Sequence, residues 1–123
     1  MLEAFSPAGQ TVALSIGATA TNATITSLVP VRSYYVTNLG SAPIQLRFDP
    51  IQQQTAVFAT PGSPSLGPVI GNQDDVIINI PIALTTATQN GLVYNCYFSG
   101  ISNTTTQSLV YITPVVVDGN FRA

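Results

Sequence analysis

The stretch Pro43-Ile44-Gln45-Leu46-Arg47-Phe48-Asp49 decides the fold class. After the proline, its even-numbered positions carry Ile, Leu and Phe, whereas its odd-numbered positions carry Gln, Arg and Asp. A period of two is typical of a β-strand with one dry face and one wet face. A second strand-like segment, residues 32–38, comes just before it, and the link between them contains Asn38, Gly40 and Ser41, which favour turns. We therefore expect these two segments to pair as a hairpin.

The rest of the chain repeats this pattern in short segments that are separated by turn residues. Thr, Val, Ile, Tyr and Phe are common and good helix formers are scarce, which favours strands. Seven or eight strands predict an all-β fold, a single-domain antiparallel β-sandwich that is jelly-roll-like. The further strands that we expect cover residues 10–16, 23–28, 76–82, 83–89, 92–99 and 108–117, with Asn90-Gly91 as a hairpin turn and a brief extra strand at 56–59 as an alternative.

A chain of 123 residues fits one domain with one hydrophobic core. We expect a single β domain over residues 1–123, with a flexible N-terminal arm over about residues 1–10. Residues 50–68 are rich in Gln, Pro and Gly and predict a long loop. A loop of this length in a compact domain usually has a function or takes part in an interface.

The chain carries very little charge. It has three basic residues, all arginine, five acidic residues and no histidine, so that 7% of its residues are charged against a usual value of ~25%. Without histidine there is no imidazole base and no histidine-ligated metal, and a net charge of −2 does not suit a row of phosphates or an anionic membrane surface. No run of 18 apolar residues occurs. We predict no enzymatic activity, no cofactor, no metal, and no contact with nucleic acid or membrane.

Two groupings of polar residues have both a functional and a structural interpretation. Asp74-Asp75 could bind Ca²⁺, but the alternating spacing of a calcium loop is missing, which favours a solvated turn. The five tyrosines could form a platform for a glycan, or they could be half-buried cross-strand partners. Cys96 lies between aromatic residues, and this setting predicts a buried, inert thiol. A single cysteine without an N-terminal export signal fits synthesis in a reducing cytosol.

The arginines offer candidates for an interface. Arginine without lysine is the composition expected where charges must be desolvated in a contact between proteins. The alternative is a surface ion pair between Arg47 and Asp49, which would contribute little stability. The segments that we expect to touch a partner are residues 1–10 and 50–68. The candidate interface residues are Phe5, Arg32, Arg47 and Phe121.

Three stretches together carry a resemblance to known proteins. They are the opening Phe5-Ser6-Pro7-Ala8-Gly9-Gln10-Thr11-Val12-Ala13-Leu14, the expected hairpin at residues 32–48, and the closing Val110-Tyr111-Ile112-Thr113-Pro114. In these stretches the chain resembles small virion structural proteins of tailed bacteriophages, several of which are capsid decoration or cement proteins. The loop at residues 50–68 and the tail at residues 118–123 depart from the compact pattern of such proteins.

The resemblance implies a jelly-roll-like subunit that is made in the host cytoplasm and ends up on the capsid surface of the virion. It would bind the major capsid protein as a homodimer or homotrimer, over junctions between shell subunits, and stabilise the shell. Two alternatives stay open. One is a head-to-tail adaptor or a tail or fibre attachment subunit, present in few copies, and the other is a receptor-binding or glycan-binding β module.

Overall fold

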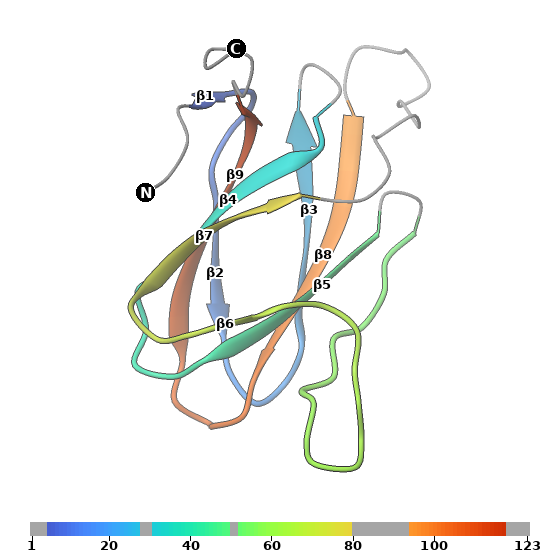
Figure 1. The fold of residues 1–123 in the computed structure, drawn as a ribbon, viewed down its shortest axis with the longest axis vertical. Coiled ribbons are helices and arrows are strands. Elements are labelled where there is room, and N and C mark those ends of the chain that lie inside the picture. The colour runs from blue at the N-terminus through green and yellow to red at the C-terminus, as the bar shows by residue number, and fades with distance from the viewer. Residues whose placement is uncertain (1–4, 28–30, 50–51, 80–93, 118–123) are drawn as a thin grey trace.

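The computed structural model describes residues 5–27, 31–49, 52–79 and 94–117, which form two antiparallel β-sheets and no helix (Figure 1). One sheet contains β1, β2, β9, β4 and β7, and the other contains β3, β8, β5 and β6. The strands are β1 (Phe5–Pro7), β2 (Val12–Ile16), β3 (Thr21–Ser27), β4 (Ser33–Asn38), β5 (Ile44–Asp49), β6 (Val69–Ile70), β7 (Asp74–Asn79), β8 (Tyr94–Ser102) and β9 (Ser108–Val117). The prediction of an all-β antiparallel sandwich is confirmed, and its jelly-roll arrangement stays a prediction.

The described residues contain nine strands, and two of them, β1 and β6, were not among the seven or eight predicted strands. β1 and β2 follow one another along the same side of β9, with Pro7 opposite Val115 and Val12 opposite Ile112. Between them the chain turns toward the second sheet, where Gly9 forms a bridge with Ser27. A Cβ atom at Gly9 would lie 2.5 Å from the Thr26 carbonyl oxygen, so this close approach requires glycine.

Part of the predicted N-terminal arm, residues 5–7, forms β1. The ten-residue strand β9 extends beyond β2, and β1 pairs with the backbone groups at its end. Backbone groups at the end of a strand need hydrogen-bond partners, and the pairing of β1 with β9 supplies them. The remainder of the arm includes residues 1–4, which lie outside the described residues.

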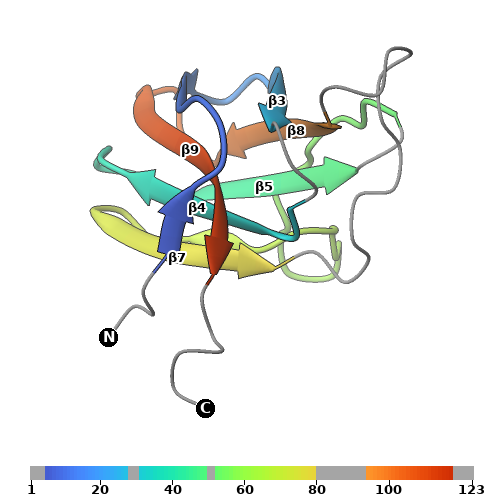
Figure 2. The same ribbon diagram turned by 90° about the horizontal axis from the view of Figure 1, so that it is seen from above.

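The predicted hairpin between residues 32–38 and 43–49 is also wrong, because β4 and β5 belong to different sheets. β4 pairs with β7 and β9, whereas β5 pairs with β6 and β8 (Figure 2). Asn38 organises the link between them, since its side chain donates to the Ala42 carbonyl at 3.0 Å and accepts from the Gly40 amide at 2.9 Å. The turn residues therefore build a crossing between the two sheets, with the dry faces of both strands turned toward each other.

The hydrophobic core lies between the two sheets. Its centre contains the rings of Tyr34 and Phe98, which meet edge to face with their centroids 5.0 Å apart. Val110 and Ile112 bring β9 into this core, whereas Leu109 on the other face of the strand is exposed. Other buried members of the core are Leu14, Ile16, Ile25, Val31, Val36, Ile44, Leu46, Ile70, Ile78 and Cys96.

Several expected elements do not match strands of the structure. Residues 56–59 form no strand, and the expected strand at 76–82 begins earlier, as β7 at Asp74. The Asn90-Gly91 turn and the strand at 83–89 lie outside the described residues.

Candidate protein-binding surface

The long loop between β5 and β6 is folded against the outer face of the second sheet. Gln45, predicted on the wet face of its strand, is only 1% exposed because residues 52–68 cover it. Its Nε2 donates to the carbonyl oxygens of Leu66 at 3.3 Å and Gly67 at 2.9 Å, and its Oε1 accepts from the Ala59 amide at 2.8 Å. One buried side-chain amide thus holds both arms of the loop, with its polar atoms satisfied.

A second group of contacts attaches the first arm of the loop to β8. The buried Ala56 donates its amide to Ser99 Oγ at 2.9 Å, and Gln53 Nε2 donates to the Phe98 carbonyl at 3.0 Å. Ser99 is fully buried although it lies on the outer face of its strand. The loop is therefore a fixed part of the fold, and its green trace runs along the sheet before its tip projects beyond the strands (Figure 1).

The second arm returns to the sheet through Gly67. This glycine has φ of 105°, and a Cβ atom there would lie 1.7 Å from the Leu46 carbonyl oxygen. The same Cβ would lie 3.3 Å from the Cα atom of Arg47, which places the backbone of that predicted interface residue directly beside the loop. Only glycine allows this approach, so the path of the chain is fixed where the loop meets β5.

This well-anchored loop displays apolar side chains to solvent. Val57, Leu66 and Val69 are 60%, 65% and 52% exposed, and we call them the loop surface. All three belong to the segment that Gln45 organises, since Val69 lies opposite Gln45 in the pairing of β5 with β6. The sequence has no charged residue from 50 to 73. Exposed apolar side chains on a fixed, uncharged support are typical of a surface that contacts another protein.

The four predicted interface residues do not form one cluster. Phe5, in β1, and Arg32, just before β4, lie at the same end of the first sheet, on either side of β9. Arg32 is exposed and borders a hollow of about 320 Å³ that Ser33 and Asn79 also line. Arg47 is half-buried in the second sheet, beside the loop, and Phe121 lies outside the described residues.

The residues that form the loop surface were not predicted individually. The alternation in β5 predicted that Gln45 is exposed to water. This prediction is wrong, because a local pattern does not reveal a distant segment that covers a strand. The signal that pointed to this region was its length together with its lack of charge. That signal predicted an interface loop but gave neither its anchors nor the apolar side chains that it exposes.

The tyrosine platform loses one of its members. Tyr34 is fully buried, and its hydroxyl has no hydrogen-bond partner among the described residues. Its neighbour is Cys96, and burial raises the pKa of this thiol to about 11, so the thiol is protonated at neutral pH. Burial raises the pKa of Tyr34 as well. Tyr97 and Tyr111 are half-buried on the outer faces of the sheets.

The acidic pair has local roles at the start of β7. Asp74 Oδ1 accepts from the Asp75 amide at 2.8 Å, and the Tyr35 hydroxyl donates to Asp75 Oδ2 at 2.6 Å. Within the described residues, no group of three or more His, Cys, Asp or Glu side chains is close enough to hold a metal ion. In the same part of the chain, no helix is long and apolar enough to span a membrane.

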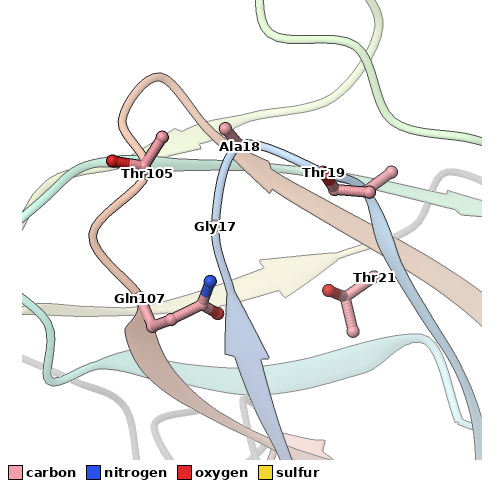
Figure 3. Close-up of a pocket in the computed structure, with 7 residues that line it drawn as sticks. Gly17, Ala18, Thr19, Thr21, Thr105 and Gln107 are labelled. Carbon is pink, nitrogen blue, oxygen red and sulfur yellow. The ribbon is translucent and has the colours of Figure 1, made fainter.

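A small polar hollow of about 240 Å³ lies between the β2–β3 and β8–β9 connections (Figure 3). Gln107 approaches it from one side of the Gly17 segment and Thr21 from the other, and Ser15 Oγ donates to Gln107 Oε1 at 2.9 Å. It is smaller than most ligand sites, which measure about 300 to 1,000 Å³. Its lining consists of Gly17, Ala18, Thr19, Ala20, Thr21, Thr105 and Gln107.

Comparison of the chain with known protein families and with curated proteins finds no match.

Proposed function

We propose that this protein is a non-enzymatic structural component of a virus particle, of the decoration or cement type. It binds the outer surface of a phage head through the loop surface, and its partners are the major capsid protein and other copies of itself, as a homodimer or homotrimer. The proposal is based on the way the loop at residues 52–68 is anchored and on the side chains that it exposes. Its backbone is fixed by Gln45 and Ser99, while Val57 and Leu66 stay exposed.

The lack of charge supports binding to a protein surface. An ion that enters an interface must lose its water, which opposes association unless an opposite charge replaces the water. The loop surface contains no ion, so the apolar area of Val57, Leu66 and Val69 contributes to binding without that penalty. Because the loop is held in place beforehand, little further conformational entropy is lost on docking.

The mechanism of stabilisation is thermodynamic linkage. A protein that binds the assembled shell and not its separated subunits shifts the equilibrium toward the shell. Each copy contributes a small free energy, and self-association lets one unit contact several shell subunits at once, which strengthens weak contacts by multivalency. No catalytic group is needed for this role.

The proposal is tested by co-sedimentation of the purified protein with phage heads that lack it. The variant V57S/L66S removes two exposed apolar side chains, and we expect about 100-fold weaker binding, since burial of each contributes about 1.5 kcal/mol. The matched control is L109S/V116S, which changes the same two residue types on exposed positions of β9. Equal binding by both variants would refute the role of the loop surface.

An adaptor or a fibre attachment subunit would share this fold and this composition. These roles differ in the number of copies in each particle, which is a few for a ring or a fibre and many for a shell. The co-sedimentation assay therefore tests the binding surface, and a count of copies tests the location.

A further inference from the structure

The edges of the two sheets differ in how well they are protected. An unpaired edge strand attracts another strand, and proteins usually block it with charge, proline, an interruption or short length. Among the described residues, β6 is only two residues long and follows Pro68, and β7 begins with Asp74 and Asp75. The β1–β2 edge is interrupted after Pro7. Three of the four edges therefore have a protective feature.

The fourth edge, β3, has none of these features. Its sequence, Thr-Asn-Ala-Thr-Ile-Thr-Ser, is seven residues long and contains no charge and no proline. One side of β3 pairs with β8 along its whole length. On its other side, the described residues form one strand bridge, between Gly9 and Ser27, at the end of the strand. Thr21 Oγ1 also donates to the Ser15 carbonyl at 3.2 Å, but within the described residues no strand pairs with residues 21–25 on this side, and the segment carries no charge.

We infer that residues 21–25 of β3 pair in antiparallel fashion with the same residues of a second copy of this chain. This inference rests on the self-association included in the proposed function and assigns a surface to it. A two-fold axis at Ala23 places Asn22 opposite Thr24 of the second copy. The pairing joins the second sheets of the two copies into one continuous sheet, with one isologous interface.

The side chains of β3 suit this register. Residues that face each other in an antiparallel pair must lie on the same face, and the axis at Ala23 satisfies this rule for both copies. Asn22 and Thr24 are exposed, uncharged and able to form hydrogen bonds across the pair. Ala23, at the axis, is small enough for two copies to approach closely. Residues 26 and 27, beside Gly9, stay outside the paired segment.

The test measures the mass of the full chain by sedimentation velocity over a range of concentrations. The variant N22K/T24K places lysines opposite each other at two positions, and we expect the dimer dissociation constant to rise about 100-fold, tenfold for each like-charge pair. The control N103K/T105K adds the same charge to the same two residue types in the exposed β8–β9 connection and should leave the constant unchanged. Circular dichroism confirms that both variants are folded.

The outcomes separate the inference from the self-association on which it rests. A dimer that N22K/T24K dissociates and N103K/T105K does not supports pairing at β3. An oligomer that neither variant changes overturns pairing at β3 and leaves self-association intact, whereas a monomer at every concentration overturns both. If N22K/T24K fails to fold, hydrogen exchange of the unmodified protein decides. The amides of residues 21–25 that point away from β8 must gain protection as the dimer forms, and unchanged exchange at these amides overturns the inference.

Discussion

Replacing Gln45 with alanine tests the claim that one buried amide holds the loop surface in place. The change removes three hydrogen bonds, to the Ala59 amide and to the carbonyl oxygens of Leu66 and Gly67. Each bond contributes about 1 kcal/mol, and the backbone groups left behind are partly rehydrated through the space that the side chain vacates. We expect the free energy of unfolding to fall by about 2 to 4 kcal/mol, measured by urea denaturation.

Hydrogen exchange locates the effect of this substitution. The Ala59 amide loses its acceptor, so its exchange should accelerate more than that of amides in the core strands. The control is Gln52→Ala, because Gln52 is an exposed residue of the same loop, and it should change the free energy of unfolding by less than about 0.5 kcal/mol. A loss below about 1 kcal/mol for Gln45→Ala, with unchanged exchange at Ala59, would show that Gln45 does not hold the loop in place.

Four further predictions concern the loop and the core. Gly67→Ala should lower the free energy of unfolding by more than about 3 kcal/mol in urea denaturation, because the new Cβ atom meets the backbone of β5. The matched control is Gly62→Ala, at a glycine with φ of 81° and open space around it, which should lower the free energy of unfolding by only about 1 kcal/mol. The Cys96 thiol should resist a thiol reagent at pH 8 until the protein unfolds, because its pKa is raised to about 11 by burial. The folded state holds the proton of the Cys96 thiol more tightly than the unfolded state does. The contribution of this proton to the free energy of unfolding is therefore complete below about pH 9 and is lost as the pH rises to 11. Urea denaturation at several pH values measures this loss. Phe98→Ala removes the ring that packs on Tyr34 and should lower the free energy of unfolding by about 3 to 5 kcal/mol. A smaller loss than that of Gly62→Ala would contradict the central place of Phe98 in the core.

The fold class could be predicted from sequence because strand patterns are local. The alternation at Ile44 and Leu46 indicated a dry face, and both side chains are fully buried in the core. Pairing partners are not local. Asn38 and Gly40 are typical of a hairpin turn, but the same residues also serve a crossing between two sheets, and only the distant strands β8 and β9 decide which one forms.

The candidate surface could be predicted as a region but not in detail. Length and lack of charge indicated the loop, whereas the burial of Gln45 depends on where the loop folds back, which no local period encodes. The arginines were a weaker guide. Arg32 lies just before β4 of the first sheet and Arg47 lies in β5 of the second sheet, so their shared chemistry did not predict a shared site.

The copy number of this chain in purified virus particles is the measurement that tests the proposed place on the shell. Quantitative mass spectrometry gives the ratio of this chain to the major capsid protein. For a decoration protein we expect a number of copies comparable to that of the shell subunit. A handful of copies in each particle, or none, would contradict this proposal.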